Sequence, residues 1–173
     1  TMVGRLIRAC KMDELSQLWN VLVGDMSLVG PRPNVPVEIG RYTETEKMLL
    51  TVKPGITDVS SIVFADEGRI LASSADPDLD YNRLIRPWKS RLGILYIEHR
   101  STAMDIALMV MTALAIVSRR SALYFVDRLL NRIGAPEDVR EVARRQSRLL
   151  PAAPPGATRP VIAADLYGGR LAA

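Results

Sequence analysis

The sequence is poor in the residues that build disulfides and metal clusters. Among its 173 residues it has one cysteine, Cys10, and one histidine, His99. A single cysteine cannot form a disulfide within the chain, and too few soft ligands remain for a metal site based on cysteine or histidine. These absences exclude a disulfide-stapled secreted domain and favour a reducing, cytoplasmic location.

Aromatic residues and long apolar runs are also scarce. Aromatic side chains make up 5% of the chain and are not interleaved with the basic residues, which argues against stacking on single-stranded nucleic acid. In the most apolar stretch, residues 106–117, Thr112 is the only polar residue. This stretch is too short to cross a bilayer as a helix. Residues 103–117 therefore predict a buried core helix, with a helix lying in a membrane interface as the alternative.

The positive charge is concentrated in one part of the chain. The formal net charge is +4. Residues 1–118 contain 13 Lys and Arg against 14 Asp and Glu, whereas residues 119–148 contain 8 Arg against 4 acidic residues. Because this basic segment follows the apolar one, it indicates attraction to anionic lipid rather than nucleic-acid binding. We therefore expect membrane lipids among the partners and no nucleic acid.

Residues 10–33 (CKMDELSQLWNVLVGDMSLVGPRP) have the most informative pattern in the chain. Apolar side chains at i, i+3, i+4 and i+7 predict a helix over residues 12–23. Asp13 and Glu14 lie in its first turn, where free backbone N–H groups and the helix dipole favour ionised carboxylates. An ionised carboxylate can act as a nucleophile or as a Mg²⁺ ligand, although acidic residues in a first turn are also common capping residues.

A rigid turn that carries one arginine follows this helix. Gly30 permits a close approach of another backbone, while Pro31 and Pro33 fix φ on both sides of Arg32. An arginine held in this way is suited to presenting its planar guanidinium to a phosphate. The alternative is a structural turn with an exposed arginine.

The remaining pattern is mainly helical, and the predicted fold class is α+β, mainly α, with a small β element. Thr43 and Glu46 form a capping box, and a turn is predicted at Pro54 and Gly55. Strand signals are short and lie near residues 3–7 and 56–64. Further helices are predicted at residues 35–50, 65–73, 81–100, 103–117 and 123–149, the third interrupted at Pro87 and the last at residues 134–136.

Composition divides the chain into three parts. Residues 1–118 have nearly balanced charge, and residues 119–150 form a basic amphipathic helical extension. Residues 151–173 are rich in Pro, Ala and Gly, and they predict a flexible tail without a fold of its own.

The run DELSQLWNVLVGDMSLVGPRP, followed by KPGIT at residues 53–57, closely resembles the bacterial sugar transferases, the small monotopic phosphoglycosyl transferases. The resemblance continues through SIVFADEGRILASSADPD, IRPWKSRLGILYIEHRS and MDIALMV. It departs from the family at Asp58, where the family usually has glycine, which puts the geometry of that turn in question.

The resemblance implies a monotopic, membrane-associated catalytic domain, with residues 1–118 as its catalytic core. Amphipathic membrane-interface helices would surround the small β element, and we expect them at residues 84–97, 103–117 and 123–133. The implied location is the cytoplasmic face of the bacterial inner membrane.

The resemblance also implies a reaction, in which Asp13 is the nucleophile and Glu14 a ligand of Mg²⁺. A sugar-1-phosphate would pass from a UDP-sugar to polyprenyl (undecaprenyl) phosphate through an aspartyl-phosphosugar intermediate, with release of UMP. This would be the first membrane step of polysaccharide or glycoconjugate synthesis. A carboxylate that approaches a diphosphate is repelled, so a divalent cation and cationic side chains must neutralise charge. The candidates for binding substrate phosphates are Arg32, Lys53, Arg5, Arg8 and Arg100.

A non-catalytic, membrane-peripheral scaffold or assembly module that retains the transferase fold is the alternative. Family members carry an upstream segment with a re-entrant membrane helix, so we expect that the numbered chain begins inside a longer protein. The basic extension, which compact members do not need, also supports the alternative. The sequence leaves open whether the chain forms a homo-oligomer.

We therefore expect the 173-residue chain to have little or no activity on its own. Release of UMP from a UDP-sugar, measured in detergent, checks this expectation, and a clear rate above background would contradict it.

Overall fold

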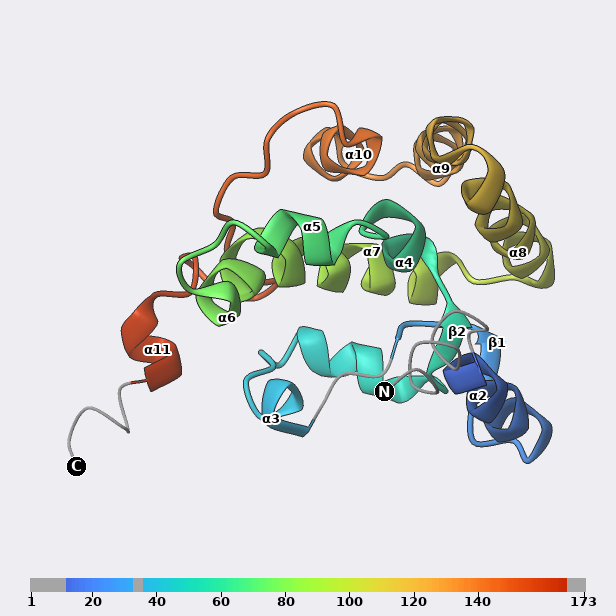
Figure 1. The fold of residues 1–173 in the computed structure, drawn as a ribbon, viewed down its shortest axis with the longest axis horizontal. Coiled ribbons are helices and arrows are strands. Elements are labelled where there is room, and N and C mark those ends of the chain that lie inside the picture. Colours follow the sequence, from blue (N-terminus) through green and yellow to red (C-terminus); the bar gives the residue numbers. More distant parts are fainter. Residues whose placement is uncertain (1–11, 33–35, 168–173) are drawn as a thin grey trace, which may run out of the picture.

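The computed structural model describes residues 12–32 and 36–167, and the side chains of residues 12–16, 36 and 37 lie outside this description (Figure 1). The fold is mainly helical with one small two-stranded parallel sheet, which confirms the predicted fold class. None of the helices described has the length and hydropathy that crossing a bilayer requires. The elements are α2 (Met12–Leu22), β1 (Ser27–Val29), α3 (Pro36–Ile39), η1 (Glu46–Thr51), β2 (Gly55–Thr57), α4 (Val59–Val63), α5 (Glu67–Leu71), α6 (Pro77–Asp80), η2 (Tyr81–Ile85), α7 (Arg86–His99), α8 (Thr102–Val117), α9 (Arg119–Arg132), α10 (Glu137–Arg144) and α11 (Ala163–Tyr167).

The sheet is smaller than the sequence predicts. β1 and β2 pair in parallel, with Ser27 opposite Gly55 and Val29 opposite Thr57. The strand expected near residues 56–64 is wrong beyond Thr57, because residues 59–63 form α4 instead. Asp58 causes this change: its side chain caps the helix, and this local capping outweighs the β preference of the branched residues that follow. The strand expected at residues 3–7 lies outside the described residues.

Helix α7 is the central element of the core. Trp88, Leu92 and Tyr96 are buried on it, and Pro87 sits in its first turn, where a missing N–H costs nothing. In Figure 1, α4, α5 and α10 lie on one side of α7 and the helical segment η1 on the other. The apolar face of α7 therefore packs in the core, and not on the surface expected for a membrane-interface helix.

A buried ion pair joins η1 to α7. Arg86 Nε and Nη2 donate to the two carboxylate oxygens of Glu46 at 3.1 and 2.5 Å, and both side chains are almost fully buried. Ser90 also donates to Glu46, and Thr43 completes the capping box that the sequence predicts. Asn82 accepts from Arg86 Nη1. Each charged group of the pair is thus hydrogen-bonded, which offsets part of the cost of removing both from water.

Helix α8 is not the buried core helix expected from its composition. Met104 and Leu108 are its only fully buried residues. An apolar stripe on the opposite face is exposed, with Ile116 and Val117 81% and 87% accessible. The stripe continues through Ile106, Met109 and Val110. The exposure matches the alternative, a helix with one face available to a membrane interface.

The chain after α10 lies along the folded core. Residues 151–162 form no helix or strand. The Arg91 guanidinium on α7 donates to the carbonyl oxygen of Ala153, and the Thr43 hydroxyl donates to that of Pro155. These contacts attach the C-terminal segment to the same region that the buried ion pair stabilises.

The buried pair leads to a stability prediction. Replacing Glu46 by alanine leaves the Arg86 guanidinium buried without its partner, and we expect the free energy of unfolding to fall by about 3–5 kcal/mol. Urea denaturation of the 173-residue chain measures this change. The matched control is Glu44→Ala, two residues away, which removes an exposed ion pair with Lys47 and should cost less than about 1 kcal/mol. Equal losses in the two variants would contradict the prediction.

Candidate functional site

Two glycine backbones touch where the arginine turn crosses the start of β2. A Cβ atom on Gly30 would lie 2.7 Å from the carbonyl oxygen of Lys53, and one on Gly55 would lie 2.1 Å from the Gly30 nitrogen. Gly55 N–H donates to the carbonyl oxygen of Pro31 at 3.1 Å. No side chain fits at either glycine, so this crossing brings the predicted turn residues Gly30, Pro31, Pro54 and Gly55 together. Pro33 lies outside the described residues.

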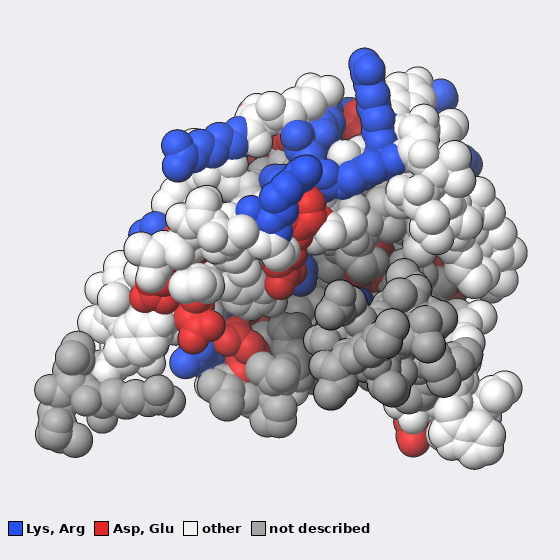
Figure 2. Space-filling model, viewed as in Figure 1, with Lys and Arg blue, Asp and Glu red and all other residues white. Residues whose placement is uncertain are grey.

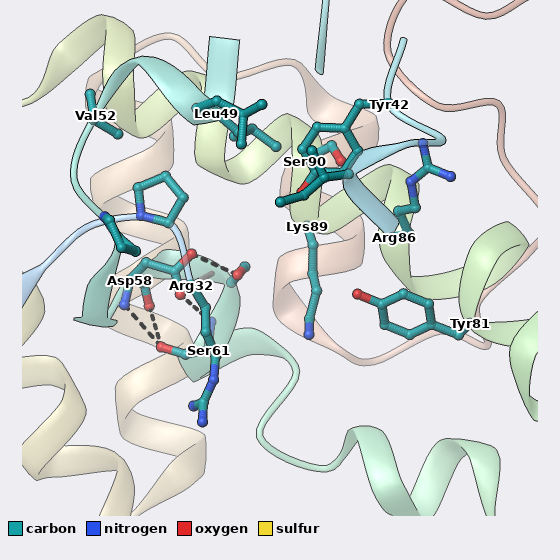
Figure 3. A pocket seen from close by; sticks show the side chains of 15 residues that line it. Arg32, Tyr42, Leu49, Val52, Asp58, Ser61, Tyr81, Arg86, Lys89 and Ser90 are labelled. Carbon is teal, nitrogen blue, oxygen red and sulfur yellow. Dashed lines mark hydrogen bonds between the residues drawn. The ribbon is translucent and has the colours of Figure 1, made fainter. Parts of the chain in front are cut away.

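On one side of this crossing, Arg32 faces a cavity of about 280 Å³ (Figure 3). Figure 3 shows Arg32 and Lys89 extending on the same side of the cavity, with Tyr81 next to Lys89. The remaining wall is partly apolar, formed by residues that include Leu49 and Val52. The cavity therefore combines cationic side chains with a partly apolar lining.

Three cations line this cavity, and they differ in how far their charge is compensated. Arg86 is buried and paired with Glu46. Lys89 forms an ion pair with Glu67 and lies 5.5 Å from the centre of the Tyr81 ring. Arg32 is exposed and makes no hydrogen bond or ion pair with the residues that the structure describes. Arg32 is thus the cation available to an anionic ligand here.

Asp58 lines the same cavity, but its carboxylate is fully used within the fold. It is 1% exposed and accepts from the Ser61 backbone N–H and the Ser60 hydroxyl, both at 2.7 Å. The backbone φ of Asp58 is −157°, an extended conformation open to any residue. An aspartate therefore fits at this position of the turn, where the family that the sequence resembles usually has glycine. Its side chain caps helix α4.

On the other side of the crossing, Lys53 and Arg100 line a second cavity of about 300 Å³. Neither cation forms a hydrogen bond or ion pair within the described part of the chain. Lys53 Nζ lies 3.8 Å from the position of a Cβ on Gly24, in the turn after α2. Two residues that the sequence proposes separately as phosphate ligands are thus brought together, while Arg32 lies in the other cavity.

A hydrogen-bonded tyrosine and aspartate form the wall of this second cavity. The Tyr96 hydroxyl donates to Asp105 Oδ1 at 2.7 Å and lies 3.3 Å from the carbonyl oxygen of Val29. Burial raises the pKa of Tyr96, and the hydrogen bond and negative charge of Asp105 raise it further. Tyr96 therefore remains a neutral donor that fixes Asp105, at the start of α8, against α7 and β1.

An apolar groove adjoins the Lys53–Arg100 cavity. It has a volume of about 490 Å³, and residues of both α2 and α8 line it. Lys53, Thr102 and Asp105 belong to both the groove and the cavity. The apolar lining consists of Val21, Met26, Leu28, Val29, Ile106 and Met109. A ligand with an anionic head and an apolar chain would find both partners here.

The predicted carboxylates lie at the opposite end of α2 from Lys53. The backbone of Asp13 and Glu14 forms the first turn of α2, as the sequence predicts, but their side chains lie outside the description. Arg5 and Arg8 lie outside it altogether. Eleven helical residues span about 16 Å, so the first turn of α2 is about that far from Gly24 and Lys53.

The side chains that the structure describes do not form a metal site by themselves. Among them there is no group of three or more His, Cys, Asp or Glu that could hold an ion. Mg²⁺ is often bound by one or two carboxylates together with substrate phosphates. A donor set of Glu14 and a substrate diphosphate would fit that mode.

Sequence reasoning missed several residues that shape the two cavities. Lys89 and Arg86 fall in a predicted helix and receive no role from the sequence, and Asp105 falls at the start of the predicted apolar helix. One signal was available for Asp105, because it is the single charged residue of a long apolar helix. The pairing of Arg86 with Glu46 joins residues 40 positions apart, and one sequence does not contain that information.

The chain matches known proteins over most of its length. The family model described as bacterial sugar transferase covers residues 1–119. The chain is 38% identical to an undecaprenyl-phosphate galactose phosphotransferase of Salmonella typhimurium, over 70% of the chain and 22% of that protein. It is 36% identical to the galactosyl transferase CpsE of Streptococcus agalactiae, over 65% of the chain and 22% of that protein.

A further relative covers a shorter part of the chain. The chain is 34% identical to a UDP-glucose:undecaprenyl-phosphate glucose-1-phosphate transferase of Caulobacter vibrioides, over 51% of the chain and 36% of that protein. The chain thus spans between about a fifth and a third of the length of these three relatives.

Proposed function

The chain belongs to the bacterial sugar transferase family, and on this basis we propose that it transfers a sugar-1-phosphate from a UDP-sugar to polyprenyl phosphate. The name of the Salmonella relative contains the acceptor, undecaprenyl phosphate, and that of the Caulobacter relative contains a UDP-sugar donor. The structural observation that supports the proposal is the meeting of Lys53 and Arg100 beside an apolar groove. A phosphate attached to a long apolar chain requires this combination.

The proposed chemistry has two steps, both at the phosphorus that bears the sugar. A carboxylate oxygen of Asp13 attacks this phosphorus, the bond to the bridging oxygen breaks, and UMP leaves with the electron pair. A phosphate oxygen of the polyprenyl acceptor then attacks the same phosphorus and releases Asp13. The position of Asp13 in the first turn of α2 supports its role, since the helix dipole keeps the carboxylate ionised.

Charge neutralisation is the main requirement of the first step. We assign Glu14 as a ligand of Mg²⁺, which when bound would offset the negative charge of the diphosphate. Arg32 is the described cation without a partner on the turn that follows β1, and its guanidinium is suited to a donor phosphate. Lys89 shares its cavity but is already paired with Glu67.

We assign the Lys53–Arg100 cavity to binding of the acceptor. Lys53 lies at the end of α2 opposite Asp13, about 16 Å away along the helix. At this distance Lys53 cannot touch the phosphorus that reacts, and Arg100 lines the same cavity as Lys53. We therefore propose that this cavity takes up the lipid phosphate first, while the apolar groove receives the first part of its chain. The phosphate then has to move from the cavity to the phosphosugar on Asp13 before its oxygen attacks.

The exposed apolar surface supports work at a membrane, and we propose the cytoplasmic face of the bacterial inner membrane as the location. Trp19 and Leu22 of α2 are 65% and 79% exposed. Ile106 and Met109, which belong to the exposed stripe of α8, line the apolar groove. Figure 1 shows α2 and α8 along the same edge of the molecule. Exposed apolar residues of this extent favour burial against lipid.

The nucleophile is tested by mass spectrometry. The natural protein, in membranes of the cells that make it, is incubated with UDP-glucose or UDP-galactose and Mg²⁺ without acceptor. We expect an added mass of one phosphosugar on the wild-type protein and none on Asp13→Asn, whose amide is a poor nucleophile. Equal turnover of Asp13→Asn and wild type would refute this assignment. No adduct and no turnover in either protein would favour the non-catalytic scaffold.

The acceptor site is tested by steady-state kinetics on the same natural protein. Because we assign Lys53 and Arg100 to binding of the acceptor, we expect Lys53→Gln and Arg100→Gln each to raise the acceptor KM by about 10- to 100-fold, with little change in kcat. The control is Lys47→Gln, whose ammonium pairs with Glu44 outside the cavity; it should leave both constants unchanged. A fall in kcat at constant KM would place the two cations at the reacting phosphorus instead.

A further inference from the structure

A third cavity lies between the start of α9 and the end of α10, in the basic extension that follows the family match. It has a volume of about 690 Å³. Asp127 is the one acidic residue of its lining. Four arginines also line it, namely Arg119, Arg120, Arg144 and Arg145. Figure 2 shows Lys and Arg side chains gathered over α5, α9 and α10, in the upper part of the view.

Two of these arginines share a single carboxylate. Arg119 Nη2 lies 2.6 Å from Asp66 Oδ1, and Arg145 Nη2 lies 3.5 Å from Asp66 Oδ2. The Nε atoms of both arginines are buried without a hydrogen-bond acceptor in the part of the chain described. Burial alone would raise the pKa of Asp66, but the charges of Arg145 and Arg119 outweigh it and hold that pKa below its usual range. Because Arg69 Nη2 also lies 3.1 Å from Asp66 Oδ2, one negative charge serves three guanidinium groups.

The other two arginines leave the cavity with excess positive charge. Arg144 pairs with Asp127 and with Glu137, and Arg140 competes for the same Asp127 carboxylate. Arg120 is exposed and has no hydrogen bond or ion pair among the described residues. A cavity with this imbalance attracts a phosphate, whose oxygens match the donors of guanidinium groups.

An apolar and aromatic margin adjoins the cavity on α9. Arg120, Tyr124 and Arg128 follow one another at i, i+4 and i+8 and are all exposed. The Tyr124 ring packs edge-to-face against Phe125, with 5.5 Å between the two ring centres. The Arg128 guanidinium lies 5.9 Å from the centre of the Tyr124 ring. Val117, at the end of the exposed stripe of α8, is only three residues before Arg120. Aromatic rings beside basic residues are typical of the lipid headgroup region.

We propose that this cavity binds the phosphate of an anionic phospholipid headgroup, with Arg120 as the accessible ligand, while Tyr124, Phe125 and the end of α8 enter the lipid interface. A free phosphate would use the arginines but gain nothing from the apolar margin, so the observations favour the lipid. The proposal rests on the proposed membrane location and extends it from α2 and α8 to the basic extension. Headgroup binding at this site would hold the extension on the same surface.

The test compares two arginines of the same helix that lie in different surroundings. Arg132 is also exposed and unpaired within the described chain, but it is 12 residues from Arg120, or about 18 Å along α9, which exceeds the Debye length of about 8 Å. Arg120→Gln and Arg132→Gln remove the same charge. Sedimentation of the 173-residue chain with vesicles of equal parts phosphatidylcholine and phosphatidylglycerol measures the affinity, and circular dichroism checks the fold of each variant.

We expect Arg120→Gln to weaken binding to these vesicles about fivefold, the effect of one basic residue at an anionic surface. Arg132→Gln should change it less than twofold, and vesicles of phosphatidylcholine alone should bind both variants and wild type equally. Equal losses in the two variants would indicate diffuse charge attraction and refute the site. Saturable binding of inorganic phosphate that depends on Arg120, without preference for phosphatidylglycerol, would refute the lipid. Either result leaves transfer to polyprenyl phosphate untouched, because that activity is measured separately.

Discussion

The contact between the backbones of Gly30 and Gly55 is the constraint on which both cavities depend. Each strand of the sheet has three residues, too few to hold a fold by ladder hydrogen bonds alone. The crossing fixes the two chain segments against each other at a distance that no side chain permits. It also separates Arg32 from Lys53, so that one short parallel pair presents cations to two different cavities. Two separate cavities would allow a donor phosphate and an acceptor phosphate to bind at different positions before they react.

The buried pair of Arg86 and Glu46 has a supporting role on one side of this crossing. It attaches η1 to the central helix α7, and η1 leads directly into residues 52–55. A buried ion pair contributes little net stability relative to apolar residues, but breaking it is costly. Its effect is therefore to exclude other positions of η1. The Tyr96–Asp105 hydrogen bond has the same effect on α8, at the wall of the Lys53–Arg100 cavity.

The helices and the tight turn could be predicted from the sequence, because their causes are local. The spacing of apolar residues predicted helices α2 and α9. The close approach of another backbone at Gly30 was predicted from the absence of a side chain on glycine. The same local reasoning failed where long-range packing decides. The apolar composition of α8 suggested burial, yet the core has room only for Met104 and Leu108. Lys53 and Arg100 were proposed one by one, and only the fold shows that they meet while Arg32 lies apart.

The sharing of Asp66 by Arg119 and Arg145 has a consequence for how the chain folds. Asp66 belongs to the part of the chain that matches the family, whereas Arg145 lies beyond the match, which ends at residue 119. Val126 and Leu130 of α9 and Val139 of α10 also belong to the main apolar core. The boundary of the family match is therefore a boundary in sequence similarity and not in structure. We expect the basic extension and the transferase fold to unfold together in a single cooperative transition.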